Sequence, residues 1–269
     1  LGDVYKRQEY GNMKKYFCLC RYEHSERITQ ELSSICDVRI IWGGNQTIET
    51  IRKASLPPRA IEMAFADRHS IAVIDSDEYL EKDADEIAKG FYTDTYYTDQ
   101  NACSSPRLVV WTGNNVNEAR EKFWTTLCEM VKSKYEMKPI QAVDKYTSMC
   151  MLGMGHEGAK LVSDDNYVVR VEVDKLYPEL MDYKNGGGYF FEYVAQNLDE
   201  IVPVLTKQCQ TISVLGVSKQ QVKDVVYRNG VRGVDRIVEL GQTMGLEFIW
   251  DGYKMIETMS RFVYTGEYV

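Results

Sequence analysis

One cysteine lies in a short run of small and polar residues directly before an apolar stretch. Residues 98–106 read TDQNACSSP and contain Cys103, and residues 107–111 (RLVVW) follow them. Small neighbours leave room for a carbonyl group to approach the sulfur, and backbone N–H groups in such a loop can stabilise an oxyanion. This pattern is typical of a nucleophilic cysteine. A buried apolar thiol is the alternative, and it is the more common role of a single cysteine.

Two glycines occupy a predicted strand-to-helix junction. Gly43 and Gly44 stand in the segment 42–48, which reads WGGNQTI. Without side chains, this backbone could approach a diphosphate at the helix N-terminus, where the helix dipole favours an anion. The alternative is a tight turn without a ligand.

Composition narrows the class of protein. The chain has 269 residues and a net charge of -8, which argues against a nucleic-acid binder with a basic face. No apolar run reaches the roughly 20 residues that span a bilayer, so we expect no membrane span. Seven scattered cysteines indicate free thiols and a cytoplasmic protein. Cys18 and Cys20 form a lone CxC without a second pair, so we expect no metal site.

Helix and strand patterns alternate along the first hundred residues. A helix is expected where Ile28, Leu32 and Ile35 share one face, with Ser25 as its N-cap. A second helix follows the glycine pair. Strands are predicted at 16–20, 38–42, 60–65 and 70–74. This alternation implies parallel strand pairing and an α/β fold.

The remainder of the chain continues the same pattern. The apolar stretch after Cys103 predicts a strand, and the alternating valines of 167–173 predict a half-buried strand. The three consecutive glycines at 186–188 predict a flexible turn. Helices are expected at 83–90, 117–135 and 251–262.

Five sequence blocks resemble the acyl-CoA reductase family typified by the luminescence reductase LuxC, which belongs to the aldehyde dehydrogenase superfamily. Several blocks in the same order are far more specific than one, and the resemblance extends from about residue 16 to the end of the chain. The blocks are 42–52 (WGGNQTIETIR), 99–107 (DQNACSSPR), 188–193 (GYFFEY), 210–216 (QTISVLG) and 250–262 (WDGYKMIETMSRF).

The resemblance implies roles for several residues. Cys103 matches the nucleophile, which would carry the acyl group as a thioester until hydride from NADPH reduces it. Gly43 and Gly44 match the turn against the cofactor diphosphate. Glu62 falls where the superfamily places a general-base glutamate, although residues 64–65 are Ala-Phe instead of two glycines. The alternative for Glu62 is a carboxylate at a strand end without a catalytic role.

Two further residues match less closely. Glu192 resembles the glutamate that holds the nicotinamide ribose, and a carboxylate can accept both ribose hydroxyls. A solvated charge is its alternative. His156 stands in 153–158 (GMGHEG), which resembles the glycine-histidine block of CoA-acylating aldehyde dehydrogenases, where it would position substrate. Glu157 replaces the usual threonine, and a structural histidine is the alternative.

The resemblance also implies the domain organisation, in an aldehyde dehydrogenase-like α/β fold. We expect the C-terminal part of a Rossmann-like cofactor domain at 9–89, the catalytic domain at 90–250, and a C-terminal helix and tail at 251–269. Residues 1–8 (LGDVYKRQ) begin without methionine and resemble translated adapter sequence, so we expect them to be non-native. Full-length family members are longer, which implies a chain truncated at its N-terminus.

The predicted function is NADPH-dependent reduction of a fatty acyl-CoA to a fatty aldehyde through an acyl-cysteine. An acyl-protein synthetase is the expected partner, and a homo-oligomer is expected from the superfamily. One alternative is a CoA-acylating dehydrogenase for short aldehydes. Another is a catalytically incomplete fragment, whose exposed sheet edge would invite aggregation or pairing.

Overall fold

The computed structural model describes residues 11–156, 158–162 and 165–266. The segment 1–8, predicted to be non-native, and Glu157 lie outside the described residues. The chain divides into two compact units, Leu1–Ala66 and Asp67–Val269.

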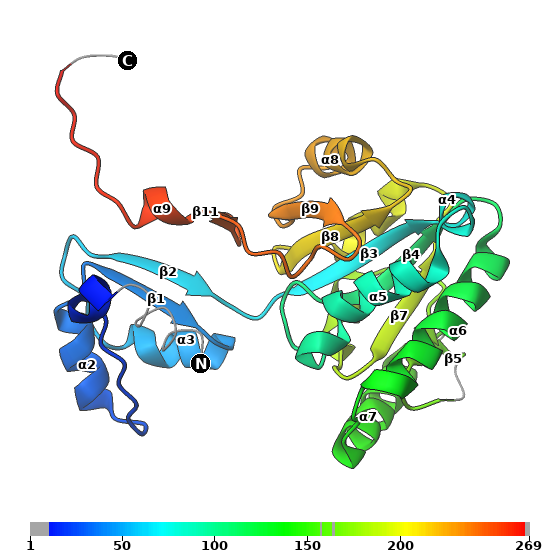
Figure 1. Cartoon of the computed structure of the whole chain (residues 1–269), viewed down its shortest axis with the longest axis horizontal. Helices are drawn as coiled ribbons and strands as arrows, with labels where there is room; N and C mark the ends of the chain where they lie inside the picture. Colours follow the sequence, from blue (N-terminus) through cyan, green and yellow to red (C-terminus); the bar gives the residue numbers. More distant parts are fainter. Residues whose placement is uncertain (1–10, 157, 163–164, 267–269) are drawn as a thin grey trace. The chain divides into compact units, whose positions relative to one another are not determined.

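The first unit contains a two-stranded parallel sheet and two α-helices, drawn in blue to cyan in Figure 1. Val38 pairs with Ile61, and Trp42 pairs with Phe65. In chain order the elements are η1 (Gly11–Tyr16), α2 (Glu26–Ser34), β1 (Val38–Trp42), α3 (Asn45–Arg52) and β2 (Ile61–Phe65).

Local sequence signals account for most of this unit. The Ser25 side chain accepts a hydrogen bond from the backbone N–H of Ile28 at 3.4 Å, which confirms the predicted N-cap. The predicted inward face of α2 is wrong at Ile35, which is 78% exposed. The strand predicted at 16–20 is also wrong, because η1 ends at Tyr16 and residues 17–20 have no regular structure.

The second unit is built on a seven-stranded sheet with the order β5-β6-β7-β4-β3-β8-β9. Every neighbouring pair is parallel except β5 and β6. The strands are β3 (His69–Asp75), β4 (Pro106–Thr112), β5 (Lys160–Leu161), β6 (Val169–Glu172), β7 (Tyr189–Val194), β8 (Cys209–Leu215) and β9 (Arg236–Glu239).

The central strands are apolar on both faces, as expected for parallel strands covered by helices on each side. In β3, Ile71 and Val73 face one core cluster, whereas Ala72 and Ile74 face the other. This alternation follows from the two-residue period of a strand.

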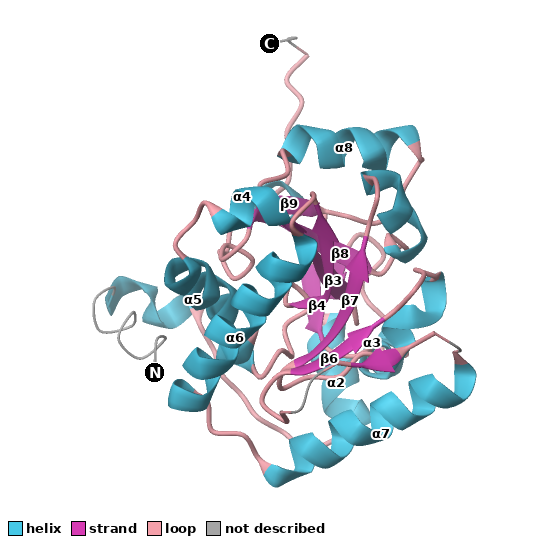
Figure 2. Cartoon of the chain, turned by 90° about the vertical axis from the view of Figure 1, so that its right-hand side faces the viewer, coloured by secondary structure: helices cyan, strands magenta, loops and turns pink. Residues whose placement is uncertain are grey.

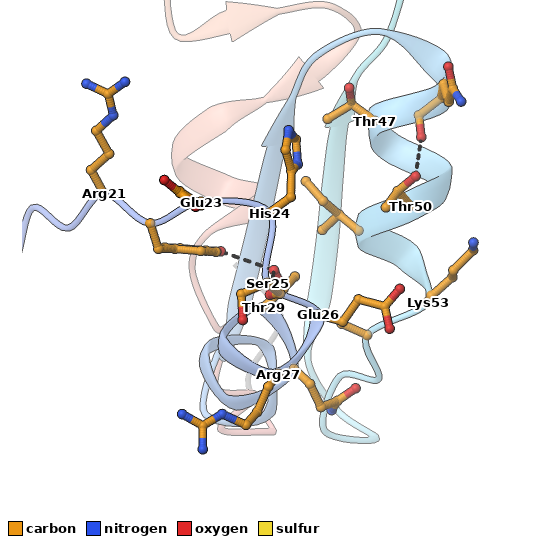
Figure 3. Close-up of a pocket in the computed structure, with 15 residues that line it drawn as sticks. Arg21, Glu23, His24, Ser25, Glu26, Arg27, Thr29, Thr47, Thr50 and Lys53 are labelled. Atoms are coloured by element: carbon orange, nitrogen blue, oxygen red, sulfur yellow. Dashed lines mark hydrogen bonds between the residues drawn. The ribbon is translucent and has the colours of Figure 1, made fainter.

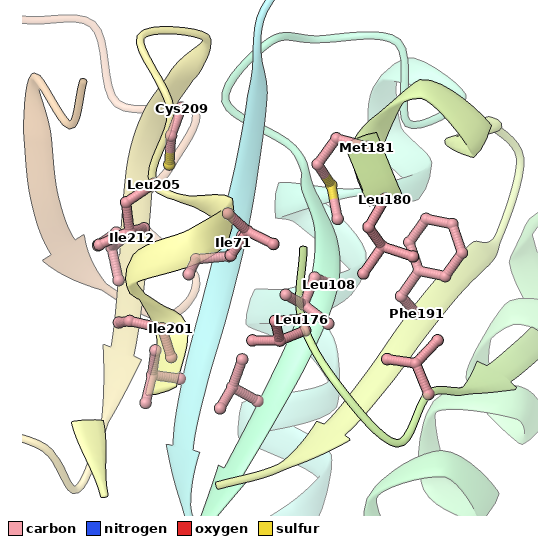
Figure 4. Close-up of a cluster of buried hydrophobic side chains, with 14 of the residues drawn as sticks. Ile71, Leu108, Leu176, Leu180, Met181, Phe191, Ile201, Leu205, Cys209 and Ile212 are labelled. Atoms are coloured by element: carbon pink, nitrogen blue, oxygen red, sulfur yellow. The ribbon is translucent and has the colours of Figure 1, made fainter. Parts of the chain in front are cut away.

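Helices cover both faces of this sheet. An aromatic-rich cluster lies under α4 (Ser76–Leu80), α5 (Ala84–Asp94) and α6 (Val116–Lys134), and α5 lies beside α6 in Figure 2. The other cluster, shown in Figure 4, contains residues of the strands and of four helical elements that cover this face. These are α7 (Pro139–Gly155), η3 (Pro178–Tyr183), η4 (Leu198–Val204) and α8 (Lys219–Arg228).

Two sequence-based expectations differ from this architecture, and one helix was not anticipated. The domain boundary was expected after residue 89, whereas β3, α4 and the start of α5 precede that residue and belong to the second unit. The C-terminal helix predicted at 251–262 is wrong: a hairpin of β10 (Ile249–Trp250) and β11 (Tyr253–Lys254) precedes the short α9 (Met255–Thr258). Helix α7 was not predicted.

Within the part of the chain that the structure describes, no helix is both long and apolar enough to cross a membrane.

Candidate active site

Cys103 lies in the loop between η2 (Tyr96–Thr98) and β4, at the edge where that strand begins. Its side chain is half-buried. The Ser70 hydroxyl donates to the Cys103 carbonyl oxygen at 2.7 Å and accepts the backbone N–H of Thr211 at 3.1 Å. The central strands β3 and β8 therefore fix the backbone that carries the thiol.

Gln100 holds the Cys103 loop against the start of β7. Its buried amide nitrogen donates to the carbonyl oxygens of Pro106 and Tyr189 at 2.9 and 3.0 Å. Its amide oxygen accepts the N–H groups of Gly188 and Tyr189, both at 3.0 Å. The Asp99 and Gln100 backbones both have positive φ, 52° and 57°, which is uncommon for residues other than glycine. The loop is a specified conformation, because every polar atom of the Gln100 amide is used.

The glycine turn at 186–188 contacts the Cys103 loop directly before β7. Gly187, with φ +62°, donates its N–H to the Asp99 carbonyl oxygen at 2.8 Å. Lys145 of α7 is fully buried and donates to the Gly187 carbonyl oxygen at 2.7 Å and to that of Asn166. Burial lowers the pKa of Lys145 to about 8.

The charges around Cys103 act in opposite directions. Burial raises the pKa of its thiol, and the carboxylates of Asp251 and Asp67 raise it further. The backbone N–H of Arg68, which hydrogen-bonds the sulfur, and the Arg107 charge act to lower the pKa. The net result is a pKa above the ordinary value, so the resting group at neutral pH is the thiol.

The C-terminal hairpin brings a carboxylate to this site. Asp251 stands in the β10–β11 turn with φ 53° and accepts from Arg68 Nη1 at 2.6 Å. Arg68 also pairs with Asp235 and donates to the Cys209 carbonyl oxygen at 2.7 Å. A Cβ on Gly252 would lie 2.9 Å from Asp235 Oδ1. The ion pair of Asp251 and the lack of space at Gly252 explain why an Asp-Gly pair occupies this turn.

Arg107, at the start of β4, differs from the other arginines near the site. It is 7% exposed, and its Nη1 donates to the Asn185 carbonyl oxygen. Its Nε is buried and has no hydrogen-bond partner among the described residues. Burial lowers the pKa of Arg107 to about 10, and the Cys103 thiolate opposes that shift. The sequence offered one signal, a charged residue at the start of an apolar strand.

Glu192 lies in β7 and is completely buried. Its carboxylate accepts hydrogen bonds from the indoles of Trp111 and Trp124 and from the guanidinium groups of Arg120 and Arg170. Burial would raise the pKa of this carboxyl, but the two arginines outweigh it and the pKa lies below its ordinary value. The donors of this chain occupy the carboxylate, which favours a structural role over the predicted contact with a ribose.

Glu62 lies in β2 of the first unit and is held by two arginines. It accepts from Arg52 Nε at 2.6 Å and from Arg39 Nε at 3.0 Å. Partial burial would raise its pKa, but Arg52 and Arg39 lower it below the ordinary 4.5. A carboxylate with a lowered pKa is a weak general base, so the geometry provides little support for the predicted catalytic role.

His156 follows the last residue of α7. Its ring stacks on Tyr177 with 4.3 Å between centroids and meets Tyr183 edge-on at 5.1 Å. These ring contacts hold the end of α7 against η3. The substrate-positioning role of His156 stays a prediction.

The two predicted glycines stand at the N-terminus of α3. Gly44 is the N-cap and provides no side-chain cap, and a Cβ on Gly43 would lie 3.1 Å from Thr47 Cγ2. A groove of about 1430 Å³ runs between α3 and the segment before and within α2. Figure 3 shows Thr47 and Thr50 on one side of the groove and His24 on the other. The contacts of Gly43 and Gly44 with a cofactor stay predictions.

The architecture of this chain is that of the aldehyde dehydrogenases. One similar structure is that of a putative methylmalonate-semialdehyde dehydrogenase from Sinorhizobium meliloti in complex with NAD. The superposition covers 85% of this chain and 51% of the other, with a TM-score of 0.56 and 14% sequence identity. An NAD-dependent aldehyde dehydrogenase from the same organism gives a TM-score of 0.54 at 10% identity, over 79% of this chain and 45% of the other. At such identities the likeness shows the fold alone.

The family follows from the sequence comparison. The model for the acyl-CoA reductase (LuxC) family matches residues 6–262, so the chain belongs to that family. It is 28% identical to the long-chain acyl-protein thioester reductase of Vibrio harveyi, over 80% of this chain and 43% of the relative. It is 25% identical to the long-chain acyl-protein thioester reductase of Aliivibrio fischeri, over 82% of this chain and 45% of the relative. The resemblance seen in the five sequence blocks is confirmed, and the chain spans less than half the length of these relatives.

Proposed function

We propose that this chain carries the acyl-transfer and reduction chemistry of a long-chain acyl thioester reductase, with Cys103 as the acyl carrier. The observation that carries the proposal is the construction of the Cys103 loop. Gln100, Ser70 and the glycine turn fix its backbone, while the Arg68 N–H and the Arg107 charge favour an anionic sulfur. A purely structural thiol needs none of these contacts.

The proposed reaction has two stages. The Cys103 thiolate attacks the carbonyl carbon of an acyl-CoA, the bond to the CoA sulfur breaks, and free CoA thiol leaves after taking up a proton. Bound NADPH would supply the hydride that reduces the enzyme thioester. The tetrahedral product then re-forms its carbonyl, the carbon–sulfur bond breaks, and the electron pair returns to Cys103. The released product is a fatty aldehyde.

The first unit has features that fit a dinucleotide phosphate. The uncapped first turn of α3 presents backbone N–H groups, and Gly43 and Gly44 keep side chains away from it. Thr47 and Gln46 add polar groups to the adjoining groove. We assign the phosphates of NADPH to this helix terminus. The choice of NADPH over NADH comes from the family resemblance.

The donor of the acyl group is proposed by analogy with the relatives. Their names describe reductases of long-chain acyl-protein thioesters. We therefore propose an acyl-protein synthetase as partner, with acyl-CoA as a second donor. A cytoplasmic location and a homo-oligomer complete the proposal.

The test is intact-protein mass spectrometry after incubation with acyl-CoA substrates of increasing chain length. Wild-type protein should gain a hydroxylamine-labile adduct of acyl mass, and Cys103→Ala should gain none. Cys150→Ala is the matched control, because Cys150 is a half-buried thiol on α7 and should leave the adduct unchanged. Adding NADPH should then remove the adduct and produce the aldehyde, detected by gas chromatography.

The outcomes distinguish the proposed reductase from the alternative functions. A preference for short acyl groups would favour a CoA-acylating dehydrogenase of short aldehydes. An adduct that persists with NADPH would mean that this chain transfers acyl groups without completing the reduction. A folded wild-type protein without any adduct would overturn the role of Cys103.

A further inference from the structure

The Arg107 guanidinium is a buried cation, and no carboxylate of the described residues pairs with it. Among the described residues, Nη1 to the Asn185 carbonyl oxygen is its only hydrogen bond, and no carboxylate lies within ion-pair distance. By contrast, Arg120 and Arg170 of the same unit, which are 12% and 18% exposed, both pair with Glu192. A buried unpaired charge costs several kcal/mol, so its retention calls for a functional explanation.

Arg107 lies beside the loop that carries Cys103. It is the second residue of β4 and stands only four residues after the cysteine. Its Nη1 is 3.9 Å from the position of a Cβ on Gly186, and that same point is 2.8 Å from the Asp99 carbonyl oxygen and 3.1 Å from Asn101 Oδ1. The guanidinium therefore lies where the Cys103 loop and the glycine turn meet.

Other polar atoms in this loop also lack partners. Nine buried side-chain atoms have no hydrogen bond within the described residues, and Thr98, Ser105 and Arg107 contribute three of them. Unsatisfied buried polar atoms are uncommon in folded proteins. Three such atoms within residues 98–107 indicate that this segment is arranged to contact a bound group.

The neighbouring charges leave Cys103 as the natural partner of Arg107. The titratable groups that face one or both of them are Asp67, Arg68, His69 and Asp251. Arg68 is already paired with Asp235 and Asp251. His69 is neutral at pH 7, because burial and nearby cations lower its pKa to about 4. The thiolate of Cys103 is the anion that favours the charged form of Arg107.

We propose that Arg107 is the counter-charge of the Cys103 sulfur. It stabilises the thiolate before acyl transfer, and it stabilises the same anion as the leaving group when the reduced acyl carbon releases it. This inference rests on the proposed function for the second step. In that step the oxyanion re-forms the carbonyl, the carbon–sulfur bond breaks, and the electron pair stays on sulfur beside the guanidinium. Acylation removes the thiolate charge, so the uncompensated cation also favours the return of the anion.

The test is the pH dependence of iodoacetamide alkylation at Cys103, followed by peptide mass spectrometry. Replacing Arg107→Met should raise the pKa of Cys103 by about one unit, which slows alkylation at pH 7 about tenfold. Arg107→Lys keeps a charge and should restore most of the rate. Arg236→Met is the matched control, because Arg236 is 9% exposed and donates to the carbonyl oxygens of Thr243 and Gly245.

The proposal would be overturned if folded Arg107→Met protein gave the alkylation pH profile of the wild type. It would also be overturned if Arg236→Met raised the pKa of Cys103 by the same amount. If Arg107→Met does not fold, wild-type protein still decides. The ratio of iodoacetate to iodoacetamide rates at Cys103 should exceed that of N-acetylcysteine, because a buried cation attracts the anionic reagent. A ratio at or below that of N-acetylcysteine would overturn the proposal. Alkylation needs neither acyl-CoA nor NADPH, so this result is independent of whether an acyl adduct forms.

Discussion

Two of the buried charges in the second unit, those of Glu192 and Arg107, have very different surroundings. Glu192 lies between two arginines and two tryptophan indoles, so its charge is matched and its oxygen atoms are bonded. Arg107 is about as deeply buried, yet among the described residues it has only a carbonyl oxygen as partner. The compensated charge of Glu192 belongs to the framework of the fold, whereas we propose that the chemistry at Cys103 supplies the partner of Arg107.

The largest effect is expected at the compensated charge. Replacing Glu192→Gln keeps the shape but leaves Arg120 and Arg170 buried without a full counter-charge, which should cost about 3–5 kcal/mol of unfolding free energy. Urea unfolding followed by circular dichroism measures this. Glu172→Gln is the control, because Glu172 is 35% exposed and, among the described residues, pairs only with Arg120. It should cost under about 1 kcal/mol. Equal costs would show that the Glu192 cluster is not the framework we describe.

A second prediction concerns the buried Lys145, which supports the glycine turn. Its folded pKa of about 8 lies below the unfolded 10.5, so between these values the unfolded chain binds more protons. Stability should therefore rise with pH from about 8 to 10, by on the order of 2 kcal/mol from this group. Lys145→Met should lack this part of the rise. Parallel pH curves for the two proteins would mean that Lys145 does not titrate as we describe.

A third prediction sharpens the comparison directly. Arg107→Met removes a buried charge that has no carboxylate partner, and a thioether chain fills similar space. The unfolding free energy should stay within about 1 kcal/mol of wild type or increase. Thermal and urea unfolding measure it. A loss comparable to that of Glu192→Gln would place Arg107 in the framework and remove the contrast.

The smallest effect is expected in the first unit. Arg52 is 53% exposed, so Arg52→Gln should change stability at pH 7 by under about 0.5 kcal/mol, while Arg39 still holds Glu62. Because the folded pKa of Glu62 is lowered, its stabilising contribution is present above the unfolded pKa and is lost in acid. The difference between variant and wild type should vanish as pH falls through the folded pKa. A difference that persists in acid would mean that Arg52 acts by packing alone.

Local patterns predicted the central elements of the fold. Runs such as 70–74 and 107–111 place apolar residues on both faces of the strand. This pattern identifies a buried strand even when the strands that pair with it are unknown. The predicted helix at 251–262 failed because Asp251 and Gly252 both adopt positive φ, which a regular helix excludes. The hairpin is held there by Arg68, which is distant in sequence.

The candidate site was only partly predictable for the same reason. The small residues around Cys103 are a local signal for a loop before β4, and the nucleophilic role of Cys103 stays a prediction. Glu192 stands 72 residues from Arg120, and no local pattern shows that this arginine reaches it. Arg107 presents the opposite difficulty, because a sequence cannot show that no carboxylate meets a buried arginine. Compensation of charge is a property of the packed sheet, not of the segment.

The most direct test of the central claim is a protection experiment on all seven cysteines. The folded protein is incubated with a long-chain acyl-CoA, then treated with iodoacetamide, and the alkylated fraction of each cysteine is read by peptide mass spectrometry. Our account predicts that acyl-CoA protects Cys103 alone and that hydroxylamine restores its alkylation. Equal alkylation of Cys103 with and without acyl-CoA, or protection centred on another cysteine, would contradict the account.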